Sequence, residues 1–243
     1  DLSENTWENK NPNKSPTARS EHVLTAVYND DKIVTFGGHG GSNDTWVYDL
    51  SDNNWTEKKP ASSPPWHEKY GLASLSDDDK CVLFGGENGT GLMSDTWVYD
   101  LSDNNWSKKA PSTYPSARKD LFMSPVYADD KVVLFGGDDG ATDDETWIYD
   151  VSADSWTLKT PSSSPRGRFN HAMASLFNES RTVLFGGNDG SYSDEVWIYN
   201  SSSNNWIRKT PVVRPEPVTE LAMAAISGDD KILLFGGNGL DGA

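Results

Sequence analysis

The chain has 243 residues, with 37 Asp and Glu against 21 Lys and Arg, a formal net charge of −16 and a pI near 4.5. This balance argues against binding a nucleic-acid backbone, which requires clustered Lys and Arg, and against attraction to an anionic membrane. No apolar run approaches the roughly 18 residues of a membrane span, so we expect no membrane insertion.

One segment recurs along the chain and organises the rest of it. The same twelve letters stand at Asp44–Trp55 and Asp95–Trp106, looser copies run from Glu145 to Trp156 and from Glu195 to Trp206, and the chain opens with the tail of another copy, Asp1–Trp7. Copies of an antiparallel unit that return at a fixed period indicate a repeat architecture.

An apolar run ending in Phe-Gly-Gly precedes each full copy, and it recurs 48 to 51 residues apart, at Phe36, Phe84, Phe135, Phe185 and Phe235. A period near 50 residues built from short strands is typical of a β-propeller blade. The single cysteine, Cys81, excludes an intramolecular disulfide and occupies a strand position that is apolar in most other copies. We therefore expect it to be a buried, inert thiol.

The third copy shows the strands of one blade, which we name a to d from the axis outward. Leu121–Ala128 is apolar, Lys131–Phe135 is nearly all apolar, Thr146–Val151 alternates aromatic and smaller residues, and Ser155–Lys159 ends in a charge. Turn residues separate them, as in an antiparallel sheet. A run as apolar as strand b fits burial on both faces, between neighbouring blades.

Gly-Gly followed by Tyr and, after six intervening residues, by Trp resembles the kelch repeat, and the resemblance covers the whole chain. The Tyr–Trp pairs are Tyr48 and Trp55, Tyr99 and Trp106, Tyr149 and Trp156, Tyr199 and Trp206. The resemblance implies an all-β, kelch-type β-propeller, and we expect the aromatic pairs to pack between blades.

Kelch propellers typically close by pairing N- and C-terminal strands within one blade. We therefore expect one domain, 1–243, of five four-stranded blades, with repeats near 32–79, 80–130, 131–180 and 181–230 and a last blade of 231–243 plus 1–10. In that blade Ile232–Gly237 supplies strand b and Asn5–Lys10 strand d, while strand c has no counterpart. Since the chain starts inside a repeat, we expect it to be a piece of a longer protein. Kelch propellers more often have six or seven blades, so further repeats are the alternative to a count of five.

Length varies only in the loop between strands b and c, which indicates a surface position at a rim. The acidic b–c loop Asp138–Glu145 could offer several oxygens to Ca²⁺, but its spacing does not match an EF-hand and Asp-Gly is ordinary turn chemistry. We expect no cofactor, with calcium as the alternative.

The d–a connections have a fixed length and changing letters, and an arginine recurs in them at Arg19, Arg118 and Arg168. The resemblance implies that d–a and b–c loops share one face and hold a partner. The candidate ligand-binding residues are Arg19, Trp66, His67, Asn88, Tyr114, Arg118, Asp139, Arg168, Phe169 and Asp189. The alternative is that each arginine pairs with an acidic neighbour such as Glu87, Asp138 or Asp189 and ties the rim together.

No Ser-His-Asp or HExxH arrangement is readable, and we predict neither catalytic nor metal-binding residues. The resemblance raises one class of enzyme, the copper radical oxidases with a kelch-like domain. These need a Tyr crosslinked to a Cys, together with paired His ligands, and Cys81 in strand b does not fit that role.

We therefore expect a monomeric, non-enzymatic module that binds a protein or peptide through the loop-bearing face. An acidic partner is favoured because guanidinium groups bind carboxylates bidentately. The alternatives are a carbohydrate-recognition module, suggested by Trp66 and the Asn/Asp-rich rim, and a structural propeller domain of a larger secreted protein or enzyme. The sequence identifies no compartment, and we favour an extracellular or cell-surface location over the cytoplasm.

Overall fold

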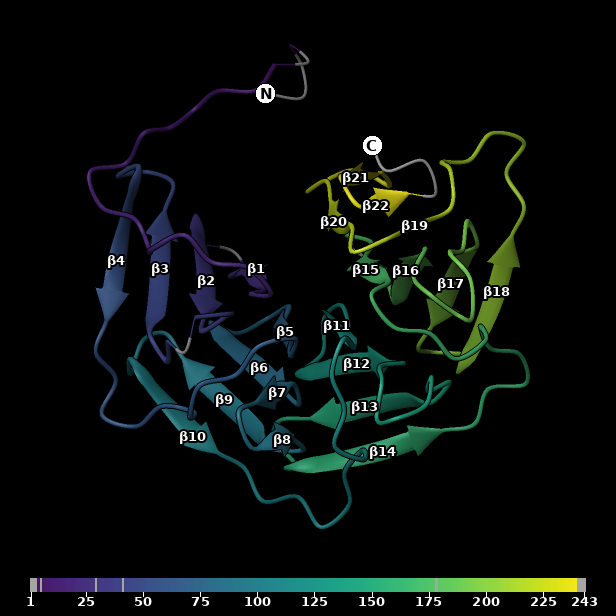
Figure 1. The fold of residues 1–243 in the computed structure, drawn as a ribbon, viewed down its shortest axis with the longest axis horizontal. Coiled ribbons are helices and arrows are strands. Elements are labelled where there is room, and N and C mark those ends of the chain that lie inside the picture. The colour runs from purple at the N-terminus through teal and green to yellow at the C-terminus, as the bar shows by residue number, and fades with distance from the viewer. Residues whose placement is uncertain (1–3, 5, 29, 41, 178, 240–243) are drawn as a thin grey trace.

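The structure, a computed structural model, describes residues 4, 6–28, 30–40, 42–177 and 179–239. Within these residues it consists of antiparallel strands and turns without a helix, so no helix there is long and apolar enough to cross a membrane. Five groups of strands follow one another around a central axis, with β1, β5, β11, β15 and β20 innermost (Figure 1). This is the arrangement of a β-propeller.

Four of the groups are complete blades, in which strands a to d pair in that order from the axis outward. The first blade contains β1 (Leu24–Ala26), β2 (Lys32–Phe36), β3 (Thr45–Asp49) and β4 (Asn54–Lys58). The second contains β5 (Gly71–Ser74), β6 (Lys80–Phe84), β9 (Thr96–Asp100) and β10 (Asn105–Lys108), with the hairpin β7 (Glu87–Asn88) and β8 (Gly91–Leu92) in its b–c loop. The third contains β11 (Phe122–Pro125), β12 (Lys131–Phe135), β13 (Thr146–Asp150) and β14 (Ser155–Lys159). The fourth contains β15 (Ala172–Ser175), β16 (Arg181–Phe185), β17 (Val196–Asn200) and β18 (Asn205–Lys209).

The predicted strands of the third copy are confirmed, with strand c one residue shorter, at Thr146–Asp150, and a larger difference at strand a. It covers only Phe122–Pro125, because the amide of Val126 already donates to the carbonyl oxygen of Lys131 at 2.9 Å and begins the turn. Cys81, on strand β6, is fully buried, and burial raises the pKa of its thiol to about 12. The expectation of a buried thiol is therefore confirmed.

Three of the four outer-strand tryptophans pack between blades, as predicted, whereas among the described residues the ring of Trp55 contacts only that of Tyr48 in its own blade. The ring of Trp106 lies 5.0 Å from that of Tyr99 in its own blade and 5.3 Å from that of Phe36 in the preceding blade. Its side chain is 1% exposed. The same contact between neighbouring blades recurs in the pairs Phe84–Trp156 and Phe135–Trp206.

The first glycine of Phe-Gly-Gly lets two neighbouring blades approach closely in the four complete blades. Gly85 has φ +70°, and a Cβ there would lie 2.6 Å from the carbonyl oxygen of Arg118 in the next blade. A side chain at this point would force the blades apart and would strain the backbone. The motif is thus a spacer between blades as well as the end of strand b.

The fifth group of strands is not a complete blade within the described residues. β20 (Ala222–Ala225) pairs with β21 (Ile232–Phe235), and β19 (Val218–Thr219) pairs with β22 (Asn238–Gly239). Residues 6–10 form no strand, so the predicted outer strand of this blade is not formed there. Asn5, its first residue, and residues 240–243 lie outside the described residues.

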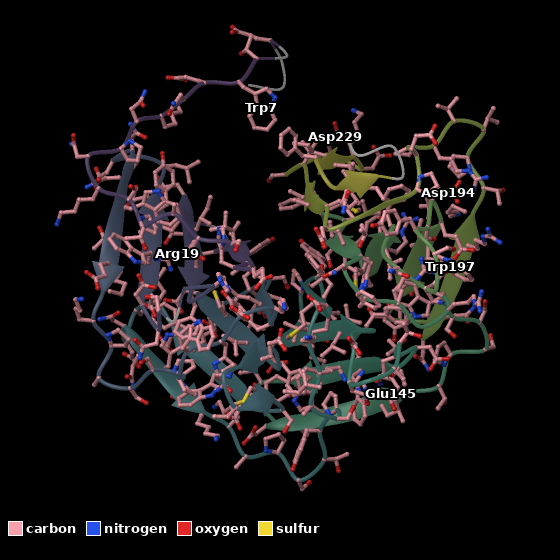
Figure 2. All side chains as sticks on the ribbon, in the orientation of Figure 1. Trp7, Arg19, Glu145, Asp194, Trp197 and Asp229 are labelled. Atoms are coloured by element: carbon pink, nitrogen blue, oxygen red, sulfur yellow. The ribbon has the colours of Figure 1, made fainter. Side chains whose placement is uncertain are left out.

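The N-terminal segment reaches the fifth group through a different contact from the one predicted. The ring of Trp7 lies 5.3 Å from that of Phe235, on strand β21 (Figure 2). Trp7 is thus related to Phe235 as Trp106 is to Phe36 in the preceding blade. The five-bladed closure would instead place Trp7 in the fifth blade, against Phe185. Within the described residues this ring contact, and no strand pairing, joins the N-terminal segment to the fifth group, and the number of blades stays a prediction.

Candidate functional site

One residue per blade, just before the innermost strand, adopts a left-handed backbone conformation. These residues, which we call the mouth ring, are Glu21, Lys69, Asp120, Asn170 and Glu220, with φ between +53° and +58°. From Lys69 onward, each amide donates a hydrogen bond of 2.9 to 3.1 Å to the carbonyl oxygen of the ring residue in the preceding blade. A continuous chain of backbone hydrogen bonds therefore joins the five blades around the axis.

The residue before each member of the mouth ring pairs with the first residue of the b–c loop in its own blade. Examples are the bridges Glu68–Glu87 and Phe169–Asn188 and, in the first blade, the amide of His39, which donates to the carbonyl oxygen of Ser20 at 2.8 Å. The d–a and b–c loops therefore lie on one face, as the resemblance implied. We call this face the axial mouth.

A cavity of about 620 Å³ opens at the axial mouth. It is lined by all five residues of the mouth ring and by the residues that follow them, among them His22, Tyr70, Leu121, His171 and Leu221. Carboxylates outnumber ammonium groups here: the ring and its paired positions carry Glu21, Glu68, Glu87, Asp120, Asp138 and Glu220 against Lys69 and Lys119. The mouth therefore presents a negative potential to a ligand.

Ion pairs at the mouth leave part of this charge uncompensated. The ammonium groups of Lys69 and Lys119 lie 2.5 and 2.8 Å from the two carboxylate oxygens of Glu87. Burial opposes ionisation of Glu87, but hydrogen bonds from the two lysines hold its pKa below the ordinary value. Among the described residues Asp120 forms no such ion pair, and burial raises its pKa to about 6. A cationic ligand beside Asp120 would favour the ionised form of this carboxyl group.

Aromatic rings narrow the opposite end of the axis. Tyr28, Tyr127 and Phe177 follow the inner strands of the first, third and fourth blades, and their ring centroids lie 6.1 to 6.4 Å apart. Tyr28 belongs to the first blade and contacts rings of the third and fourth blades, so these side chains meet across the axis. A ligand therefore has access to the cavity from the axial mouth.

The recurring arginines are buried inside the blades and do not form a ring of free charge. The guanidinium group of Arg19 donates to both carboxylate oxygens of Asp44, at 2.7 and 2.8 Å, and to the carbonyl oxygen of Gly37. Burial opposes ionisation of Asp44, but hydrogen bonds from Arg19, Ser42 and Trp46 lower its pKa strongly. The arginine of this blade is therefore paired within the protein.

The other two arginines repeat this geometry and are fully buried. Arg118 lies 2.8 Å from Asp143 and 2.7 Å from Glu145, and Arg168 lies 2.7 Å from Glu195. Each also donates to the carbonyl oxygen of the first glycine after strand b. These contacts favour the structural alternative, in which the arginines tie the b–c loop to the d–a connection. Of the acidic partners expected from the sequence, only Asp189 is within reach, 3.4 Å from Arg168.

The remaining candidates also lie outside the cavity. His67 is buried and its Nδ1 contacts the carbonyl oxygen of Pro65, and the indole nitrogen of the half-buried Trp66 donates to the carbonyl oxygen of Gly38 at 2.7 Å. Phe169 is partly buried beside its bridge partner. Tyr114 is exposed. The loop residues Asn88 and Asp139 accept hydrogen bonds from Thr90 and Ser116.

None of the predicted ligand-binding residues lines the part of the cavity that the described residues form. The mouth ring that does so was missed, although it follows the predicted residues closely: Lys69 comes two positions after His67, and Asp120 two after Arg118. The one available signal was that these positions change identity from copy to copy within connections of fixed length. Their left-handed backbone conformation cannot be recognised from the residue type, because Glu and Lys are not typical of that conformation.

The acidic b–c loop Asp138–Glu145 uses its side chains within the third blade. Asp143 and Glu145 pair with Arg118, and the carboxylate of Asp138 accepts a hydrogen bond from the amide of Gly140 at 2.9 Å. These carboxylates therefore stabilise the turn and hold the b–c loop against Arg118 of the d–a connection. Calcium binding at this loop stays a prediction.

Two comparisons with known proteins bear on identity. A family model described as the KLHDC2/KLHL20/DRC7 Kelch-repeats domain matches residues 1–137 and 123–243, which together span the chain. A comparison with curated proteins found no match. The all-β propeller, its repeated Gly-Gly, Tyr and Trp positions and this match agree with one another. The chain therefore belongs to the kelch-repeat family, whose domains are typically non-enzymatic scaffolds that mediate protein–protein interactions.

Proposed function

We propose that this domain binds a basic segment of a partner protein at the axial mouth, with a lysine or arginine side chain entering the cavity. The observation that carries the proposal is the charge of the mouth ring and its paired positions, where carboxylates outnumber ammonium groups around a cavity of about 620 Å³. This volume falls within the range of pockets that hold small ligands and side chains. The sequence led us to expect an acidic partner, whereas this proposal names a basic one.

The reversal follows from the burial of the arginines. Arg118 and Arg168 are 0% exposed, and each is paired with carboxylates of its own blade. A partner cannot reach these guanidinium groups without unfolding the rim. The charged groups that remain accessible at the cavity are those of the mouth ring, and among them Lys69 is already paired with Glu87.

A cation in the cavity would find a carboxylate that is poorly compensated. Burial raises the pKa of Asp120 to about 6, with Lys69 and Lys119 acting in the opposite direction. An arginine or lysine head group beside Asp120 would favour its ionised form, and a partly desolvated pair is stronger than one at a free surface. A basic side chain therefore suits the site better than a sugar hydroxyl, and the half-buried Trp66 lies outside the cavity.

The test uses three fluorescent peptides that differ only in two central residues, which are arginine, neutral citrulline or glutamate. We expect the arginine peptide alone to bind in fluorescence anisotropy, and its affinity to fall as salt is raised. Because the whole chain carries −16, general attraction must be separated from the site. Asp120→Asn should weaken binding about five-fold or more, whereas the control Asp139→Asn, on the same face but outside the cavity, should leave it unchanged.

Two outcomes would overturn the proposal. Equal binding of the citrulline and arginine peptides would show that charge is not recognised. Equal affinities for Asp120→Asn and Asp139→Asn would show that the cavity is not the site. Binding to a glycan array that is lost in Trp66→Ala would favour the carbohydrate alternative instead.

A further inference from the structure

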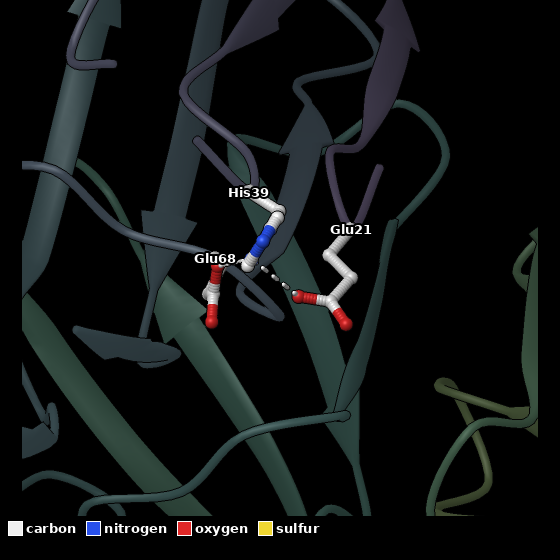
Figure 3. A group of neighbouring side chains, drawn as sticks. All are labelled: Glu21, His39 and Glu68. Carbon is white, nitrogen blue, oxygen red and sulfur yellow. Dashed lines mark hydrogen bonds and ion pairs between the residues drawn. The ribbon is translucent and has the colours of Figure 1, made fainter. Parts of the chain in front are cut away.

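We infer that Glu21, His39 and Glu68 form a binding site for one divalent transition-metal ion at the rim of the axial mouth, between the first and second blades (Figure 3). This inference goes beyond the proposed function: Glu21 and Glu68 are also among the carboxylates counted at the mouth, but the ligand here is an inorganic ion, and its test uses no peptide. It differs from the expectation from the sequence, which predicted no metal-binding residue.

The three ligand atoms are already close together. Nδ1 of His39 lies 2.9 Å from Oε2 of Glu68 and 3.8 Å from Oε2 of Glu21, and one ligand atom from each residue lies within 4.8 Å of the others. Zinc binds nitrogen and carboxylate oxygen at about 2.0–2.2 Å, which places ligand atoms of a tetrahedral site about 3.3–3.5 Å apart. The two distances measured from Nδ1 lie on either side of this spacing.

The backbone holds the three residues in place before any ion binds. The amide of His39 donates to Ser20, and the carbonyl oxygen of Glu21 accepts from Lys69 at 3.1 Å. Glu68 exchanges two backbone hydrogen bonds with Glu87, of 3.0 and 2.9 Å. The loops that carry the ligands therefore need little ordering when a metal arrives, which lowers the entropic cost of binding.

The neighbouring interface between blades shows what a cation does at these positions. The residues equivalent to His39 and Glu68, one blade further on, are Glu87 and Lys119, which form an ion pair of 2.8 Å. That interface contains its own cation in the ammonium group of Lys119. The interface of the first two blades has instead two carboxylates and an imidazole, and a metal ion would supply the missing positive charge.

The burial and charge of Glu68 point the same way. Its side chain is 11% exposed, and within the described part of the chain its carboxylate is bonded only to His39. The nearest ammonium group to Glu21, that of Lys69, lies 3.8 Å from it and is engaged with Glu87 at 2.5 Å. A buried carboxylate is stabilised by a compensating positive charge, and a metal ion between these three side chains would supply it.

The donor set indicates the kind of ion. One imidazole nitrogen with two carboxylate oxygens suits Zn²⁺, Mn²⁺, Co²⁺ or Ni²⁺, whereas Ca²⁺ and Mg²⁺ prefer sites made of oxygen alone. His39 is 66% exposed, so further coordination positions would remain open to water or to a ligand from a partner. The ion would crosslink two blades at the rim beside the cavity.

The test is calorimetric titration of the tag-free, metal-stripped protein with Zn²⁺, together with melting curves. We expect one equivalent to bind and to raise the melting temperature, since binding to the native state alone stabilises it. His39→Ala and Glu68→Gln should each lower the affinity about ten-fold or more and abolish the thermal shift. Asp139→Asn removes a carboxylate elsewhere on the same face, and it should change neither the affinity for Zn²⁺ nor the rise in melting temperature. Mg²⁺ should not change the melting temperature of the wild type.

Circular dichroism would establish that the variants fold, and the exposed position of His39 makes His39→Ala the less disruptive of the two. Absorption of Co²⁺ in place of Zn²⁺ gives a second readout, in which d–d bands that appear in the wild type and vanish in His39→Ala report direct coordination. The inference is overturned if the wild type binds no Zn²⁺ in the calorimeter, or if His39→Ala binds it with unchanged affinity.

Discussion

The indole nitrogen of Trp106 donates a hydrogen bond to the hydroxyl oxygen of Thr45 in the preceding blade, at 2.9 Å. The same bond of 2.9 Å joins Trp156 to Thr96 and Trp206 to Thr146. Each indole therefore combines apolar packing on a phenylalanine with a directed polar contact. Together these contacts set the angular position of one blade against the next.

Trp106→Ala should destabilise the protein by about 3–5 kcal/mol, because it empties a large buried site and leaves the Thr45 hydroxyl without its donor. Trp7→Ala is the matched control, since Trp7 is 80% exposed and should cost less than about 1 kcal/mol. Equilibrium denaturation measures both, and the shift of the midpoint applies even if unfolding is not two-state. Similar losses for the two variants would contradict a role for burial.

Arg168→Ala should destabilise by about 3–5 kcal/mol, because it leaves the buried carbonyl oxygen of Gly186 without this donor and removes the buried cation beside Glu195. Arg168→Lys should restore only part of this, since one ammonium group cannot span the same acceptors. Arg166→Ala removes an exposed arginine of the same connection and should have almost no effect. Thermal denaturation decides the matter, and a normal melting temperature for Arg168→Ala would return this arginine to the candidate ligand-binding residues.

Asp120 should make stability depend on pH in a defined direction. Burial raises its pKa from 3.8 to about 6, so the folded state binds this proton more tightly than the unfolded state. Asp120 therefore becomes destabilising as the pH rises from about 4 through 6, and the penalty is complete above that range. Asp120→Asn, which mimics the protonated form, should raise the melting temperature more at pH 8 than at pH 4. A difference between variant and wild type that is constant with pH would show that this carboxyl group is not perturbed.

Strand β21 should exchange its amide hydrogens faster than the equivalent strand β12 of the third blade. β21 pairs only with β20 among the described strands, whereas β12 pairs on both sides with β11 and β13. Phe235 is 62% exposed and its equivalent Phe135 is fully buried. Exchange followed by mass spectrometry measures both strands in one sample, and equal protection would mean that the edge of β21 is covered in solution.

Much of the fold was predictable because the repeat supplies its own internal comparison. The strand Lys131–Phe135 follows from its run of apolar residues. The pairing of Tyr99 with Trp106 across two neighbouring strands follows from their spacing in the sequence. The closure was not predictable, because an outer-strand Trp fits the Phe of any preceding blade. The choice between Phe185 and Phe235 for Trp7 depends on how many blades surround the axis, which no local pattern records.

The candidate site was less accessible to sequence reasoning than the scaffold. An arginine beside acidic loops can face a ligand or pair internally, and only the direction of the side chain distinguishes the two. For Arg118 the side chain turns inward to Asp143 and Glu145. The cluster of Glu21, His39 and Glu68 joins residues from separate connections, so no spacing in the chain indicates it.

The mouth ring also bears on how such a domain acquires new partners. Its blades are joined there through main-chain amides and carbonyls, so the joint does not depend on which side chain each position carries. The left-handed backbone costs about 1 kcal/mol per non-glycine residue and excludes β-branched side chains and proline, but it tolerates most polar ones. Substitutions at Glu21, Lys69, Asp120, Asn170 and Glu220 can therefore rewrite the charge and shape of the cavity one blade at a time. The side chains that line this cavity can therefore change while the main-chain hydrogen bonds that join the blades are kept.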